Sequence, residues 1–527
     1  MTTDPVQYAR RWKTLGVLSL SLVIIGLDNT ILNVALPTLQ EEFDASASKL
    51  QWMVDSYLLV FAGLLLVFGT LGDRFGRKLA LQSGIAIFGL ASLAAPFANT
   101  ANQVIAVRAG MGVGAALIMP ATLSIIANVF TGDERGKAIS IWAALAAVGI
   151  GLGPLAGGLL LEWFDWWSVF MVNVPFVIAA LLLGIRYVPE SRDPRPGSFD
   201  IPGAALSTVG FTVFVYAIIE APEKGWLSGV VLGSFAAGVV LLGSFFWWER
   251  HTADPMLDLG FFRSTRFSVG TAAVSVAFFA LLGAIFALTQ YLQFAHGYSA
   301  VEAGVIMSPI TVGLVIGAGS STKAVQRLGV ARVVAVGLLG LAIMLALTAL
   351  WGPNTQVGWL IVWFFGIALT TAWIMAPATD AVVGAVPPAK SGIASATNTV
   401  ARMVSGALGV AIVGSTISTL YSNKVDGSLA LAPHPASAAE DSIGAATAIA
   451  SHLPPDAASA LLAATSNAFT DAMGIGLLVA SGLAAVAAVF VAITLTDEPP
   501  ATSEATDAAP GRLVEDSREG DRDAVAH

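Results

Sequence analysis

The sequence predicts an all-α integral membrane protein with fourteen transmembrane helices. Of its 527 residues, 56% are hydrophobic and only 12% are charged, whereas soluble domains carry roughly a quarter charged residues. Uncharged stretches long enough to cross the hydrocarbon core, roughly 20 residues each, recur along nearly the whole chain. The alternation of basic and non-basic loops independently supports the number of helices. Most of the chain is therefore expected to lie in lipid.

The predicted helices fall into groups of six, two and six. The first group covers residues 15–37, 52–71, 79–97, 104–129, 138–161 and 168–185; the second covers 201–219 and 228–247; the third covers 269–292, 303–320, 333–351, 359–385, 396–420 and 473–494. The chain is thus expected to comprise an N-terminal segment (1–14), a six-helix half (15–190), two linking helices (191–262), a second six-helix half (263–495) and a tail (496–527).

The first apolar stretch follows three basic residues, Arg10, Arg11 and Lys13, as a secretory signal would. It is too long for a typical signal core, contains Asp28 and leads into further apolar stretches. We therefore predict that it is a retained first helix.

Basic residues predict the orientation, because Lys and Arg in short loops resist translocation. One side carries Arg10, Arg11, Lys13, Arg74, Arg77, Lys78, Arg135, Lys137, Arg186, Arg192, Arg195, Arg250, Arg263, Arg266, Lys323, Arg327, Arg332 and Lys390, and the other only Lys49, Lys224 and Lys424. Both termini are therefore predicted to be cytoplasmic. The long loop 425–467 is predicted outside, where 441–464 forms either a short helical hairpin or a disordered loop. The acidic tail from 496 onward is typical of disorder.

Several kinds of chemistry are excluded or disfavoured by composition. The chain has no cysteine, and its five histidines lack the spacing of metal ligands. No nucleotide-binding loop, paired His/Asp constellation or nucleophile motif is present. We therefore expect no metal, no cofactor, no nucleic-acid partner and no enzymatic activity, and a polytopic membrane enzyme is disfavoured.

The loop after the second predicted helix combines glycines with opposite charges. It reads Gly69-Thr-Leu-Gly-Asp73-Arg74-Phe-Gly76-Arg77-Lys78. The glycines allow two helices to approach closely, while the carboxylate and basic groups can form charge-assisted bonds that differ between conformations. A topogenic basic loop alone would explain Arg and Lys, but not Asp73 or the glycine spacing. The pattern favours a two-state conformational lock, which a passive channel would not need.

This loop resembles the signature of the major facilitator superfamily, and three further stretches match in order. Arg108-Ala-Gly-Met-Gly-Val-Gly114 resembles the family's fourth-helix motif. The stretch Gly149-Ile-Gly-Leu-Gly153-Pro154-Leu-Ala-Gly157-Gly158 is similar to the fifth-helix antiporter motif, and the Asp28 segment is similar to the first helix of fourteen-span drug and proton antiporters. The resemblance implies the major facilitator fold, with two six-helix halves and two extra central helices. The loop with Lys323 and Arg327 in the second half lacks the Asp of the first copy.

Ionisable residues inside a membrane are functional candidates, because a charge at the bilayer centre costs at least about 2.5 kcal/mol. Asp28 and Arg108 lie within predicted helices, and the resemblance implicates both in proton coupling. Burial and a neighbouring cation act in opposite directions on a carboxyl group, so Asp28 is expected either to bind and release protons or to form a structural ion pair with Arg108. Arg402 lies in the thirteenth helix, and Asp380 lies toward the cytoplasmic end of the twelfth.

Asp55 and its neighbours are candidates for substrate binding. Trp52-Met-Val-Asp55-Ser-Tyr57 resembles the second helix of exporters of quaternary ammonium compounds and cationic dyes. Asp55 is expected either to bind cations and protons or to be a polar group at the outer membrane face. Tyr57, Phe61 and Trp142 are candidate aromatic surfaces, although packing or lipid contact is the commoner role of such residues. Asn398 is a further candidate in a helix where the cation exporters carry an acid, and that departure argues against a pure dication specialist.

We therefore expect a multi-pass exporter in a bacterial cytoplasmic membrane that exchanges amphipathic, cationic drugs and dyes for protons. It is expected to act as a monomer embedded in the lipid bilayer, by alternating access between its two halves. An exporter dedicated to one endogenous metabolite, antibiotic or lipid remains open.

Overall fold

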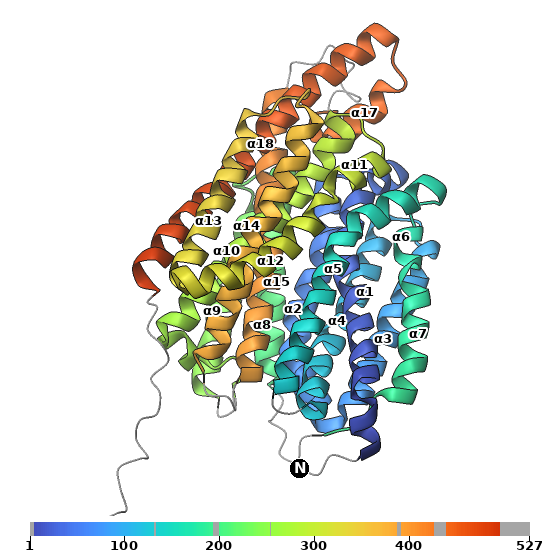
Figure 1. Ribbon diagram of the computed structural model, residues 1–527. Helices are drawn as coiled ribbons and strands as arrows, with labels where there is room; N and C mark the ends of the chain where they lie inside the picture. The colour runs from blue at the N-terminus through green and yellow to red at the C-terminus, as the bar shows by residue number, and fades with distance from the viewer. Residues whose placement is uncertain are drawn as a thin grey trace, which may run out of the picture. The chain divides into compact units, whose positions relative to one another are not determined.

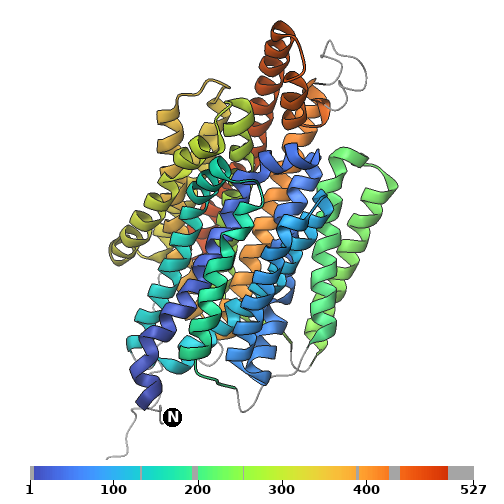
Figure 2. The ribbon, with the colours of Figure 1, turned by 90° about the vertical axis from the view of Figure 1, so that its right-hand side faces the viewer.

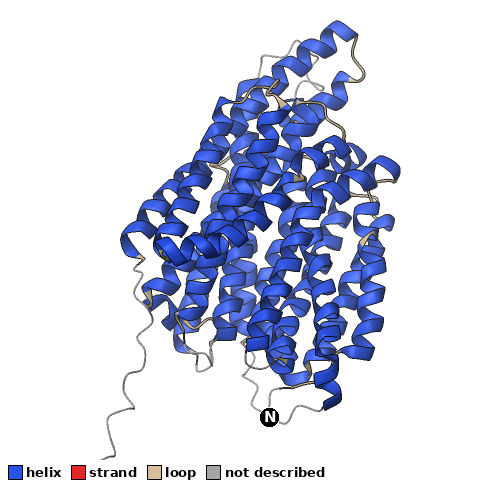
Figure 3. Ribbon diagram, in the orientation of Figure 1, coloured by secondary structure: helices blue, strands red, loops and turns tan. Residues whose placement is uncertain are grey.

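The chain folds into α-helices, and a computed structural model describes residues 5–130, 133–192, 200–252, 255–386, 391–425 and 439–495. No strand occurs in these ranges (Figure 3). Fourteen helices of the described residues are long and apolar enough to cross a membrane, as the sequence predicts. The predicted tail (496–527) and residues 426–438 of the predicted outer loop lie outside the described ranges.

The first half contains the helices α1 (Pro5–Phe43), α2 (Ala47–Phe75), α3 (Arg77–Ala94), α4 (Ala101–Val129), α5 (Asp133–Trp163), α6 (Ser168–Met171) and α7 (Asn173–Tyr187). Within it, α1 packs along α5, and α2 and α3 pack against α4. The linking helices are α8 (Ile201–Lys224) and α9 (Gly229–His251), which pack on each other. Figure 2 shows them as a green pair at one side of the bundle, and α8 contacts both α2 and α15.

The second half contains α10 (Thr265–Gln290), α11 (Ala300–Met307), α12 (Pro309–Leu328), α13 (Val330–Leu347), α14 (Val357–Gly384), α15 (Ser391–Val425) and α18 (Pro455–Thr494). Here α10 packs on α15, α12 on α14, and α13 on α18. A π-helical turn, η3 (Tyr291–Ala295), extends α10, and short 3₁₀ turns η1 (Ala95–Phe97), η2 (Leu259–Arg263) and η4 (Thr348–Leu350) stand between helices. The two halves meet mainly where α2 packs on α15 and where α5 packs on α11 and α12.

The two ends of the bundle differ in chemistry. We call the end that carries the start of α1 and the turn at Asp73–Arg77 the basic end. The opposite end, which we call the hairpin end, carries α17 (Ile443–Ala450) and the start of α18, which rise above the other helices in Figure 1. Of the two possibilities that the sequence left open for residues 441–464, the helical hairpin is therefore the one observed. Alanine clusters hold it together, because Ala439, Ala446, Ala450 and Leu461 pack in a small apolar core of their own.

Candidate functional site

A buried ion pair joins the first and fourth helices. Arg108 Nη1 on α4 lies 2.5 Å from Asp28 Oδ2 on α1, and each residue is only 1% exposed. Arg108 Nε donates a hydrogen bond to the Met53 carbonyl on α2 at 3.0 Å, and its guanidinium lies 4.4 Å from the centre of the Tyr57 ring. One arginine therefore ties together α1, α2 and α4.

The pairing of Asp28 is incomplete. Its second oxygen, Oδ1, is buried without a hydrogen-bond partner among the described residues, and so is the Tyr57 hydroxyl. The Asn173 side chain, at the start of α7, lies near Asp28 but does not form a hydrogen bond of good geometry with it. A buried polar atom without a partner costs free energy, so the ion pair leaves Asp28 only half satisfied.

Asp55 lies on the same helix as Met53 and Tyr57 but has different surroundings. It is fully buried, and neither of its carboxyl oxygens has a hydrogen-bond partner in the described part of the chain. An isolated carboxylate is costly away from water, so no contact among the described residues accounts for the burial of Asp55.

The other predicted binding residues divide between two places. Phe61 packs against Tyr57 with ring centres 5.8 Å apart, and both rings are buried. Trp142 on α5 instead donates a hydrogen bond to Thr122 on α4 at 3.2 Å. Thr122 lies fourteen residues from Arg108 along α4, which corresponds to about 21 Å of helix. The structure therefore brings Tyr57 and Phe61 to the ion pair, but not Trp142.

Asn398 belongs to the second half, on α15, and is buried with its Oδ1 unpartnered among the described residues. Arg402 follows one turn later, and its guanidinium lies 5.0 Å from the centre of the Phe278 ring on α10. The sequence marked Arg402 only as an intramembrane charge, because hydropathy and charge do not reveal which helix faces it.

The glycines of the predicted antiporter motif face two different neighbours. A Cβ added at Gly149 would lie 2.6 Å from the Val23 carbonyl oxygen, and one at Gly153 would overlap the Thr30 hydroxyl; both face α1. Gly157 faces Ile31 on the same helix. On the other side, a Cβ at Gly158 would lie 2.5 Å from the Ala300 carbonyl oxygen, and Gly304 of α11 packs on the Pro154 carbonyl. The motif thus lets α5 contact its own half and the second half at once.

The predicted conformational lock forms a tight turn at the basic end. Arg77 Nε lies 2.7 Å from Asp73 Oδ1, and Gly76 has a φ of 131°, which disfavours other residues. A Cβ added at Gly69 would lie 3.5 Å from Pro120 Cβ of α4, an ordinary van der Waals contact, and Arg74 lies beside the Phe75 ring.

The partner of this turn is a segment that the sequence did not single out. Glu190 accepts a hydrogen bond from the Lys78 amide at 3.3 Å, and the Arg77 amide donates to the Ser191 carbonyl at 3.0 Å. The sequence signal that could have identified this segment is Glu190, an acidic residue that follows α7 and can pair with the basic loop.

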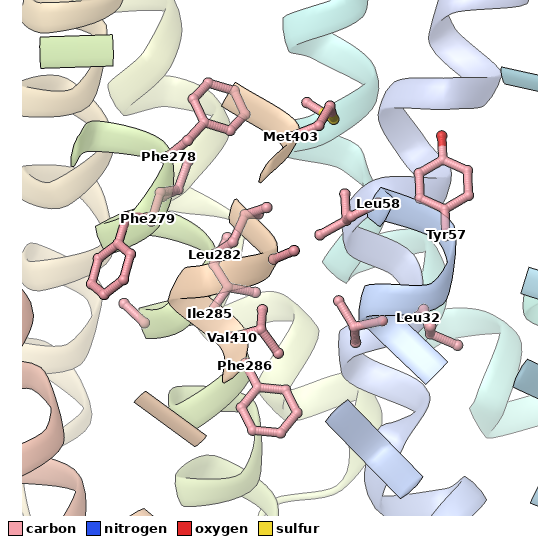
Figure 4. Close-up of a cluster of buried hydrophobic side chains, with 14 of the residues drawn as sticks. Leu32, Tyr57, Leu58, Phe278, Phe279, Leu282, Ile285, Phe286, Met403 and Val410 are labelled. Carbon is pink, nitrogen blue, oxygen red and sulfur yellow. The ribbon is translucent and has the colours of Figure 1, made fainter. Parts of the chain in front are cut away.

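Apolar side chains from both halves approach each other along the seam between α2 and the pair α10 and α15. Figure 4 shows Leu58 and Leu32 on one side and Met403, Phe278 and Leu282 on the other. Toward the hairpin end, side chains also bridge the halves: Gln40 donates to Ser442 at 2.7 Å, and Gln293 donates to the Val34 carbonyl at 2.9 Å. The seam is therefore held by hydrogen bonds at this end.

Two helical halves, a seam between them and buried charges inside the span define a membrane transporter. The chain belongs to the Major Facilitator Superfamily, whose family model matches residues 18–410. This confirms the family and fold that the sequence motifs predicted, and the protein is a transporter rather than an enzyme.

Its relatives include bacterial exporters and resistance proteins. The chain is 38% identical over 485 residues to the multidrug efflux pump LfrA of Mycolicibacterium smegmatis. The aligned residues cover 92% of this chain and 96% of that protein. This chain is 36% identical to the methyl viologen resistance protein SmvA of Salmonella typhimurium (87% and 93% covered) and 32% identical to the tetracenomycin C resistance and export protein of Streptomyces glaucescens (93% of each).

Solved structures share the fold. A bacterial homologue of the human lysosomal transporter Spinster, in an inward-facing and unoccupied conformation, superposes with a TM-score of 0.63 at 17% identity. The match covers 95% of this chain and 100% of that one.

Proposed function

We propose that the protein exports amphipathic, cationic drugs and dyes in exchange for protons, by alternating access between its halves. The observation that carries this proposal is the half-satisfied Asp28, with one oxygen on Arg108 and the other buried without a partner. Burial and the Arg108 cation oppose each other at this carboxyl. A group balanced in this way can exchange a proton when its surroundings change, whereas a fully satisfied pair is inert.

The substrate class is supported by the chemistry of Asp55 and by the relatives. A buried carboxyl with no hydrogen-bond partner among the described residues suits an organic cation, and methyl viologen, which names one relative, is a dication. The names of other relatives, such as the tetracenomycin C resistance and export protein, favour a second candidate function, export of a single antibiotic. A panel of unrelated drugs separates the two, because a dedicated exporter confers resistance to one chemical class only.

The basic end is proposed to face the cytoplasm of a bacterial cell, with both termini on that side. The support is the concentration of Lys and Arg in its loops. Because the chain has no cysteine, single cysteines at the exposed Thr322 near the basic end and Ser459 on the hairpin report the orientation. We expect a membrane-impermeant maleimide to label Ser459→Cys but not Thr322→Cys in intact cells. Labelling of both from outside would contradict the proposed orientation.

The coupling step is tested with purified protein in proteoliposomes under an imposed pH gradient. We expect Asp28→Asn to abolish concentrative uptake of ethidium, because an amide neither binds nor releases a proton in this range. Its carbonyl oxygen still accepts from Arg108, so the loss of stability is expected to stay below the 3–5 kcal/mol typical of breaking a buried ion pair.

The matched control is Asp165→Asn, which neutralises an exposed carboxylate of the same half. It is expected to transport as the unaltered protein does. If Asp28→Asn vesicles still concentrated ethidium against its gradient, Asp28 would have only a structural role, and proton coupling at this pair would be wrong.

A further inference from the structure

Arg402 is a cation inside the membrane span with no counter-charge in the described part of the chain. Its Nε is buried without a hydrogen-bond partner among the described residues, and its guanidinium lies 5.0 Å from the centre of the Phe278 ring. An arginine at this depth normally pairs with a carboxylate or with backbone carbonyls. Arg108 has an aspartate, a carbonyl and a ring as partners, whereas the described residues give Arg402 a ring and no hydrogen bond or ion pair.

The surroundings of Arg402 offer further unsatisfied polar groups. Asn398 lies one turn earlier on the same face of α15, 2% exposed, with Oδ1 unpartnered, and the hydroxyl of the neighbouring Thr397 is unpartnered as well. Arginine presents a planar fork of donors that suits a carboxylate. A cation flanked by polar atoms and backed by an aromatic ring is therefore arranged as a receptor for an acidic group.

The position of Arg402 points to the seam between the halves. The next residue, Met403, extends from α15 toward Leu58 on α2 in Figure 4. Farther along α15, Gly406 packs against Leu282 of α10, and Gly409 packs against the Phe279 backbone of the same helix. Arg402 therefore lies on a helix wall between α10 and α2, rather than at a membrane surface where a lipid headgroup would reach it.

The spacing to Asp55 can be obtained from the helix register. Gly414 of α15 packs on Gln51 of α2, since an added Cβ would lie 2.8 Å from Gln51 Cδ. From that level, Asp55 is four residues toward the basic end along α2, about 6 Å, and Arg402 is twelve residues toward it along α15, about 18 Å. An unpartnered carboxyl and an unpartnered guanidinium thus lie on facing helices, about 12 Å apart along the helix axes.

We propose that Arg402, with Asn398, binds the acidic group of amphoteric substrates whose amine is held at Asp55. The substrate class then includes elongated amphipathic molecules that carry an amine at one end and a carboxylate or enolate at the other. This inference deepens the proposed export function and rests on it for transport, but the binding step is independent of any proton gradient.

The test compares norfloxacin, which carries a piperazine amine and a carboxylate, with its ethyl ester, which keeps only the amine. Binding of each to the purified full chain in detergent is measured by equilibrium dialysis. Loss of a charge-assisted bond corresponds to about tenfold or more, so Arg402→Gln is expected to weaken norfloxacin binding at least that much and ester binding far less. Arg327→Gln, which removes an exposed arginine of the same half, serves as control.

A second variant keeps the packing of Arg402 on Phe278. Asn398→Asp places a carboxylate one turn away and satisfies the cation internally, so norfloxacin binding is expected to fall while ester binding is kept or improved. Equal weakening for acid and ester in both variants, or no weakening in either, would overturn the assignment. If the unaltered protein binds both ligands but does not move the ester under a pH gradient, the proposed export function fails while the Arg402 site stands.

Discussion

At the scale of single residues, the buried carboxyls of Asp28 and Asp55 differ in their partners. Asp28 is paired through one oxygen with Arg108, whereas both oxygens of Asp55 lack a partner among the described residues. The pair holds three helices together and has one free acceptor. Asp55 forms no hydrogen bond that would stabilise the packing of the described helices. A buried polar group without such a structural role is a candidate for ligand binding.

A second usable carboxyl changes the energetics of exporting dications. Moving one uncompensated positive charge outward costs about 2.3 kcal/mol at 100 mV, and a dication exchanged for one proton carries such a charge. Exchange for two protons is electrically neutral and gains about 1.4 kcal/mol per proton for each unit of favourable pH difference. Two carboxyls that bind protons therefore favour dication export.

We predict that Asp55→Asn weakens efflux of methyl viologen and biguanides more than efflux of the monovalent ethidium. The measurement is the initial efflux rate of each compound from cells that express equal amounts of protein, with Asp165→Asn as the matched control. Equal loss for both classes, or loss for neither, would remove Asp55 from charge selection.

Sequence reasoning predicted the candidates at this scale but not their contacts. Asp28 and Arg108 were recognisable because charges are rare inside apolar stretches. The hydrogen bond from Arg108 to the Met53 carbonyl joins α4 to α2. The hydrogen bond from the Lys78 amide to Glu190 joins the turn beside Gly76 to the segment after α7. In both cases the partners are far apart in sequence. Single-sequence patterns carry no information about such pairings.

At the scale of elements, α5 shows how glycines permit close packing. Its glycines at 149, 153 and 157 face α1, where an added Cβ would meet backbone atoms or the Thr30 side chain. In lipid, small residues permit such contacts and replace the missing hydrophobic driving force. Thr30 also donates a hydrogen bond to the Ile150 carbonyl at 2.7 Å, so its side chain has little freedom to move.

We predict that Gly153→Ala destabilises the protein by about 1–3 kcal/mol, as overpacking typically does, and slows transport. Thermal unfolding in detergent measures the first effect and proteoliposome flux the second. The control is Gly233→Ala on α9, where an added Cβ has nothing within 4 Å; it is expected to be neutral or slightly stabilising, because alanine favours helix over glycine. An unchanged melting temperature for Gly153→Ala would show that α1 and α5 can separate without cost.

The ends of the helices were the least predictable feature of the elements. The first helix was expected over 15–37 but runs from Pro5 to Phe43, and the last was expected from residue 473 but begins at Pro455. Hydropathy marks where lipid contact stops, whereas the helical backbone continues into water wherever the residues permit it. The Ala-rich stretch before residue 473 extends the helix for that reason.

At the scale of the whole molecule, the hairpin end closes the seam between the halves. Gln40 of α1 donates to Ser442 beside α17, and Ser415 of α15 donates to Gln51 Oε1 of α2 at 3.4 Å. Glycine contacts between α5 and α11 reinforce the same closure. Alternating access requires these contacts to open when the basic end closes.

The closure predicts the effect of a covalent link across the seam. Gln40→Cys with Ser442→Cys, joined by a short bis-methanethiosulfonate reagent in this otherwise cysteine-free chain, should hold the hairpin end closed and stop transport. Reduction of the link should restore it. The matched control is Lys49→Cys with Asn102→Cys, whose native side chains hydrogen-bond at 2.8 Å within the first half; because that half moves as one body in alternating access, its link should leave transport intact. Continued transport with the Gln40 to Ser442 link in place would mean that α17 stays docked on α1 throughout the cycle, and that the halves open elsewhere.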